Sequence, residues 1–120
     1  MDLSSNDLTG SVPTELGLLT MIAYLNLNMN NFSSSIPTEI GLLSNMIAFG
    51  IQVNMMIGIL PTELGHLTML SFLSIAGNSF NGTLRSEIGN LRGLTNFAVT
   101  FNNMTGVSAN KWTVTRSERV

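Results

Sequence analysis

The sequence predicts an α/β solenoid, a coil of stacked repeats with a short parallel β-sheet on its inner side and short helical turns on its outer side. Three observations predict this fold. The chain repeats itself every 24 residues without a slip in register. An asparagine recurs at this period in five repeats, and apolar residues alternate with other residues just before it. Self-similarity at one fixed period of this size is typical of repeats that stack around a continuous core.

Each repeat is expected to contain one short strand. In the second repeat Leu25 and Leu27 are apolar, whereas Asn26 and Asn28 are polar. Side chains of a strand point alternately to its two faces, so the leucines face the core and the asparagines face the opposite side. One strand per repeat, always in the same direction, predicts a parallel sheet of five strands.

The recurring asparagine follows each strand at a position where an apolar residue would fill the core. A buried side-chain amide needs hydrogen-bond partners, and the turn that leaves the strand has unpaired backbone groups to offer. We therefore expect a structural ladder of five asparagines: Asn6, Asn30, Asn54, Asn78 and Asn102.

The second half of each repeat has the pattern of a short helical turn. Pro37 suits the first position of a helix, and Glu39 favours the positive end of the helix dipole. Gly41 is expected to end the turn, because glycine accepts the left-handed conformation that closes helices. The column of glutamates at this position is interpreted as a solvated outer face in preference to a chain of metal ligands.

The periodic pattern covers residues 1–106, about five repeats of which the first is incomplete, and a degenerate tail follows at 107–120. The formal charge of −2 disfavours nucleic acid as a partner, and the lack of cysteine removes thiolate chemistry. Residues 40–62 carry no charge and are long enough for a membrane span. Their apolar positions coincide with the core positions of the repeat, so we favour a coil and expect no membrane span.

The segment LNLNMNNFSSSIPTEIGLL and its repeats resemble the leucine-rich repeat family, and the GxIPxELGxL half resembles the plant-type subclass of receptor-like kinases and receptor-like proteins. The resemblance implies a right-handed coil with the sheet on its concave face, often with a second short strand at the LxGxIP part. It also implies a binding role at the cell surface or after secretion, although the chain shows no signal peptide. Members usually have cysteine-bearing caps, which this chain lacks, so we expect a fragment whose open ends allow edge-to-edge self-association.

The candidate binding residues are those that the sheet would present on its concave side. They lie before, between and after the apolar strand positions, and most are uncharged. Aromatic and amide groups in such a set suit a protein or peptide ligand. The predicted site consists of Tyr24, Asn26, Asn28, Met29, Gln52, Phe72, Ser74, Asn96, Thr100 and Phe101.

A non-enzymatic protein or peptide binding module is the favoured function. The alternative is a structural spacer, part of a longer repeat array with no ligand of its own. An enzyme is disfavoured, because one histidine, no cysteine and no nucleophile motif leave no catalytic constellation. No cofactor is expected.

Overall fold

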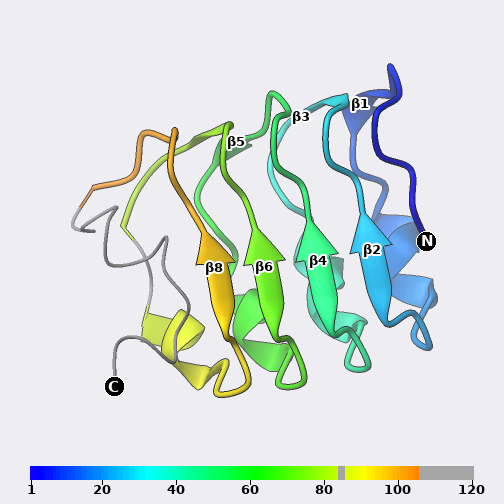
Figure 1. Ribbon diagram of the computed structural model, residues 1–120, viewed down its shortest axis with the longest axis vertical. Coiled ribbons are helices and arrows are strands. Elements are labelled where there is room, and N and C mark those ends of the chain that lie inside the picture. Colours follow the sequence, from blue (N-terminus) through cyan, green and yellow to red (C-terminus); the bar gives the residue numbers. More distant parts are fainter. Residues whose placement is uncertain (84–85, 106–120) are drawn as a thin grey trace.

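The structure, a computed structural model, describes residues 1–83 and 86–105. The chain winds as a right-handed coil in which the repeats lie side by side, with strands on one side and 3-10 turns behind them (Figure 1). The predicted α/β solenoid is confirmed. The tail predicted at 107–120 lies outside the described residues.

The concave face is a parallel sheet with one strand from each of four repeats. Paired residues are 24 apart in the sequence, as where Leu25 lies opposite Phe49. Five strands were expected, but the first repeat contributes only an isolated bridge between Asp2 and Asn26. In order across the sheet (Figure 1), the strands are β2 (Tyr24–Asn26), β4 (Ala48–Gly50), β6 (Phe72–Ser74) and β8 (Asn96–Ala98).

Two smaller parallel sheets occupy the side of the coil that follows the concave sheet, where the resemblance implied a second strand. Here the paired residues are 22 apart, as in Thr9 opposite Asn31, so neighbouring repeats are staggered by two residues relative to the concave sheet. The four strands pair as β1 (Thr9–Ser11) with β3 (Asn31–Ser33) and β5 (Ile57–Gly58) with β7 (Ser79–Phe80).

The convex face is formed by one 3-10 turn per repeat, as the proline and glutamate pattern predicts. Pro37 has extended backbone angles (φ −67°, ψ 142°) and precedes the turn, so it is the N-cap residue instead of the first helical residue. Pro13 and Pro61 have the same conformation. The turns are η1 (Thr14–Leu18), η2 (Thr38–Leu42), η3 (Thr62–His66) and η4 (Ser86–Asn90).

The glycine inside each turn has a different role from the predicted one. Gly41 lies within η2 and has no positive φ, so the prediction that it ends the turn in a left-handed conformation is wrong. A Cβ atom placed on Gly41 would lie 2.8 Å from the backbone oxygen of Glu63 in the next turn, and one on Gly17 would lie 2.9 Å from that of Glu39. Glycine is required here because successive turns stack too closely for a side chain.

The core runs the length of the coil and is built from equivalent positions of successive repeats. The strand residues Leu25, Phe49, Leu73 and Phe97 are at most 2% exposed. The charge-free stretch 40–62 forms part of this core, where Met46, Ile51 and Met56 are buried. Among the described residues, no helix has the length and apolar character needed to cross a membrane.

Four of the ladder asparagines join each repeat to the one before it. The Asn54 amide nitrogen donates to the carbonyl of Leu27 in the preceding repeat (3.0 Å) and to that of Ile51 in its own (3.1 Å). The Asn54 amide oxygen accepts the backbone N–H of Phe32 in the preceding repeat, at 3.0 Å. The same bonds recur at Asn30, Asn78 and Asn102. Each of these side chains therefore satisfies backbone groups of two adjacent repeats.

Asn6 departs from this arrangement. It was expected to be a buried member of the ladder, but its side chain is exposed and donates only to the carbonyls of Leu3 and Ser4 in its own repeat. Its side chain meets no preceding repeat in the described part of the chain, so the bonds that link two repeats are not formed there.

Candidate binding surface

The first residue of each concave strand points away from the core. Tyr24 is 59% exposed and Phe72 is 39% exposed, whereas Ala48 between them is small. Neighbouring strands lie about 4.8 Å apart, so the backbones of the two aromatic residues are about 10 Å apart. Asn96 is the exposed equivalent on β8.

A hollow of about 390 Å³ lies on the concave face beside these two aromatic residues. Ala48 and Gly50 are the small residues of its lining, and Asn26 and Asn28 also border it. The structure thus brings four predicted site residues, Tyr24, Asn26, Asn28 and Phe72, to one place. Ala48 and Gly50 occupy the columns expected on the concave side but were not among the predicted binding residues, although their small size among larger residues in the same columns was the available signal.

A chain of hydrogen bonds crosses the sheet next to this hollow. The side-chain oxygen of Asn26 accepts the backbone N–H of Asn28, at 3.1 Å, and that of Asn28 accepts the backbone N–H of Gln52, at 2.9 Å. The Ser74 hydroxyl then donates to the side-chain oxygen of Gln52, at 2.6 Å. A Cβ atom on Gly50 would lie 2.7 Å from the Asn28 oxygen, so glycine leaves room for this amide.

This chain of hydrogen bonds gives two of the predicted binding residues, Gln52 and Ser74, a structural role. Ser74 is fully buried, so the expectation that it faces a ligand is wrong, and the reason is its bond beneath the Gln52 amide. Gln52 is half-buried. Both residues therefore hold neighbouring repeats in register, while Asn26 and Asn28 keep contact with the hollow.

The other predicted residues lie outside the hollow. Met29 and Phe101 follow their strands and are 49% and 85% exposed, with positive φ values of 56° and 59°. Thr100 is half-buried. The hollow is lined by residues of the first four repeats, so Thr100 and Phe101 belong to a separate part of the surface.

Asp2 supplies the carboxylate at the edge of the hollow. The pKa of this carboxyl group is lowered, first because the Ser4 hydroxyl donates to it at 2.6 Å and second because the Ser4 backbone N–H donates at 3.0 Å. The group is therefore ionised at neutral pH. Within the described residues, no cluster of three or more His, Asp or Glu side chains is placed to hold a metal ion.

Comparisons with known proteins relate this geometry to a family. The leucine-rich repeat family pattern matches residues 21–43 and 69–91. No curated protein sequence matches the chain significantly.

Solved structures match most of the coil. A TDR receptor is 35% identical over 86% of this chain, with a TM-score of 0.85. The ectodomain of the plant membrane receptor kinase GASSHO1/SCHENGEN3 from Arabidopsis thaliana is 34% identical over 86% of the chain, with a TM-score of 0.83. The Arabidopsis receptor kinase HAESA, solved with the peptide hormone IDA and the co-receptor SERK1, is 31% identical over 87% of the chain, with a TM-score of 0.80.

The chain spans only a small part of these relatives, namely 18% of the TDR receptor chain, 12% of the GASSHO1/SCHENGEN3 chain and 17% of the HAESA chain. TM-scores of 0.80 to 0.85 show that the matched regions share the fold of this coil. The chain belongs to the leucine-rich repeat family, and its repeats are of the type found in plant receptor kinase ectodomains.

Proposed function

We propose that this chain is a non-enzymatic module that binds a peptide or an extended protein segment on its concave face. The observation that carries the proposal is the hollow flanked by Tyr24 and Phe72. Both of these rings are exposed, whereas the aromatic residues Phe49 and Phe97 of the same sheet are buried in the core. Exposed aromatic side chains beside a cavity are typical anchors of protein interfaces. The similarity to HAESA, which was solved with a peptide hormone, supports the same class of ligand.

The shape of the hollow indicates which part of a ligand it accepts. Its lining is mostly apolar, so an apolar or aromatic side chain of the ligand fits over Ala48 and Gly50, between the two rings. The amides of Asn26 and Asn28 lie at the border, where they can bond to the ligand backbone. Asn96 and the apolar side chains of Met29 and Phe101 make further contacts with the ligand outside the hollow.

A structural spacer is the second candidate function. The observation that favours it is the chain of bonds through Asn28, Gln52 and Ser74, in which side chains of the concave face bind one another. A face that satisfies its own polar groups has fewer of them to offer to a ligand.

The two functions are distinguished by selecting peptides from a random displayed library on the immobilised protein. Peptides that bind the wild type are then titrated against the Tyr24→Ala, Phe72→Ala double variant. We expect a loss of affinity of about 30-fold, the size found when a central aromatic anchor is removed. The control is Leu42→Ala on the convex turn η2, where a 56% exposed side chain is removed without touching the hollow.

Equal affinity of the double variant and the wild type would exclude the hollow as the site. Failure of the wild type to select any peptide, while the protein remains folded by circular dichroism, would favour the spacer.

A further inference from the structure

The third repeat exposes four large apolar side chains along one extended segment. Val53, Met55, Ile57 and Ile59 are 54%, 54%, 52% and 46% exposed, and they alternate with less exposed residues, two of which, Met56 and Leu60, are in the core. These four residues are named the third-repeat stripe. The stripe begins at the end of the concave sheet and continues through β5, away from the hollow between Tyr24 and Phe72.

Other repeats carry small or uncharged polar residues at nearly all of the equivalent positions. The core does not explain the difference, because Met56, which lies between the stripe residues, is buried like its equivalents Phe32 and Phe80 in the neighbouring repeats. The equivalents are Met29, Asn31, Ser33 and Ser35 in the second repeat and Gly77, Ser79, Asn81 and Thr83 in the fourth. The stripe is therefore an apolar centre with an uncharged polar border, which is the composition of a protein interface.

Val53, the first residue of the stripe, has a backbone conformation that is energetically unfavourable for its side chain. Val53 has a φ of 56°, a region that a β-branched residue rarely adopts, whereas the fourth repeat has Gly77 at the same position with a φ of 67°. A non-glycine residue in this conformation costs about 1–3 kcal/mol and persists where something offsets the cost. Ser5, Met29 and Phe101 adopt the same conformation in other repeats, so the fold of the repeat imposes it, and in the third repeat it falls on a β-branched, exposed residue.

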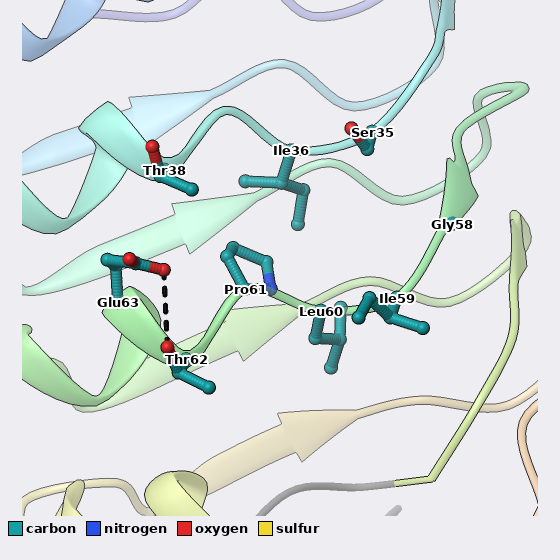
Figure 2. Close-up of a pocket in the computed structure, with 9 residues that line it drawn as sticks. All are labelled: Ser35, Ile36, Thr38, Gly58, Ile59, Leu60, Pro61, Thr62 and Glu63. Carbon is teal, nitrogen blue, oxygen red and sulfur yellow. Dashed lines mark hydrogen bonds between the residues drawn. The ribbon is translucent and has the colours of Figure 1, made fainter.

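A groove of about 490 Å³ lies next to the stripe, between the second and third repeats. Figure 2 shows it between the segment Ser35–Thr38 and the segment Gly58–Glu63, with Ile36, Leu60 and Pro61 in its lining. Ile59 belongs both to the stripe and to the border of the groove. An apolar ridge and an apolar groove therefore lie side by side on one molecule.

We propose that the third-repeat stripe is the contact surface between two copies of this chain, related by a two-fold axis. A two-fold interface requires a self-complementary surface, and a ridge beside a groove meets this requirement because each copy can place its ridge against the groove of the other. No charged residue occurs among the stripe or its equivalents in the second and fourth repeats. The groove carries one carboxylate, Glu63, at the end away from Ile59, and the ridge of the other copy brings no like charge towards it.

The exposed area of the third-repeat stripe sets the affinity expected for the dimer. An exposed apolar patch of four side chains covers a few hundred Å², which falls short of the roughly 800 Å² per partner of a standard interface. The dimer is therefore weak and reversible, and its population rises with protein concentration.

The test is the molar mass of the purified chain by sedimentation equilibrium, at concentrations up to about 1 mM so that a weak contact is populated. We expect the apparent mass to rise from 12.9 kDa towards twice this value. In the stripe variant Met55→Ser, Ile57→Ser, Ile59→Ser, we expect this rise to be lost. Each serine is the residue that another repeat carries at the same position, so the coil is retained, and no glycosylation sequon is created.

A matched control separates this contact from association through the end of the coil. Leu18 and Met21 are 77% and 83% exposed on the first turn, and Leu18→Asn, Met21→Asn replaces them with residues found at those positions in other repeats. We expect this variant to dimerise like the wild type. A wild type that stays monomeric at the highest concentration, or an end variant that alone loses the dimer, would overturn the proposal.

A second measurement does not depend on the triple variant. The chain has no cysteine, so Ile59→Cys introduces a single thiol where the stripe meets the groove. We expect it to form a disulfide-linked dimer at least about tenfold faster than Leu18→Cys under the same mild oxidation, because ridge-against-groove packing puts the two-fold axis where the stripe and the groove meet, next to residue 59 of both copies. Equal rates would also contradict the proposal.

Discussion

At the residue scale, the asparagine of each repeat shows how a polar side chain is used inside an apolar coil. Four asparagines, from Asn30 to Asn102, each bond to the backbone of their own repeat and of the preceding one. Because a backbone N–H or carbonyl that is buried without a partner is costly, these amides link folding of one repeat to folding of the next.

We predict that Asn54→Ala lowers the free energy of unfolding by about 1–3 kcal/mol, since it leaves the Phe32 N–H without its partner and removes the shorter of the two amide bonds to the Leu27 carbonyl. Asn6→Ala is the control and should have a much smaller effect, because Asn6 is exposed and bonds only within its own repeat. Thermal and urea unfolding of the two variants provide the measurement. If both variants lost the same free energy of unfolding, the bonds between repeats would contribute no more to stability than the bonds within one repeat.

A second residue prediction concerns Val53. We expect Val53→Gly to raise the free energy of unfolding by about 1 kcal/mol, because glycine avoids the cost of about 1–2 kcal/mol that other residues pay in the left-handed region. Met69→Gly is the matched control, since Met69 is 53% exposed and has no positive φ. Glycine there should lower stability. Urea unfolding at low micromolar concentration, where self-association does not contribute, would show whether the two changes differ in sign.

At the scale of the element, the 3-10 turns show that spacing alone does not reveal why a residue recurs. The glycine column correctly indicated a fixed position in each turn, but at Gly17 and Gly41 the cause is contact with the next turn and not the conformation of the glycine itself. The pattern within one repeat contains no information on how closely the next repeat approaches. Contacts between repeats therefore had to come from the structure.

This explanation predicts that Gly41→Ala lowers the free energy of unfolding by about 1–3 kcal/mol, because the new Cβ would meet the backbone oxygen of Glu63 at 2.8 Å and the turn cannot shift without moving its neighbour. Gly89→Ala is the comparison in η4, where no atom of residues 1–83 and 86–105 outside its own turn lies within 4 Å of the added Cβ. It should be neutral or slightly stabilising, since alanine restricts the unfolded chain. Similar effects of both substitutions would show that contact with the next turn is not the reason for glycine at this position.

At the scale of the whole molecule, the fold could be predicted almost completely because the period fixes the coil and the alternation fixes its core face. The candidate site could be predicted only in part. Alternation correctly placed Tyr24 and Phe72 on the concave side, but it could not show that Ser74 is covered, since this depends on the Gln52 side chain of the neighbouring repeat. The third-repeat stripe was also missed, because exposed and buried apolar residues look alike in a sequence.

The stacking of equivalent repeats leads to a prediction for the whole chain. Insertion of a second copy of residues 48–71 after Ser71 keeps every column in register and adds one repeat to the core. Stability of such coils grows with repeat number, so we expect the thermal midpoint to rise. Insertion of residues 48–59 alone adds half a repeat, which can only loop out, and should not raise the midpoint. A higher midpoint for the half repeat would contradict the 24-residue unit.

The central claim, that this molecule acts through its concave face, is tested most directly by hydrogen exchange with a library-selected peptide bound. We predict that the peptide slows exchange in residues 24–28, 48–52 and 72–76, where the strands and the hollow lie, and leaves the convex turns η1 to η3 unchanged. Protection confined to the convex turns, with no change in the three concave segments, would contradict the claim.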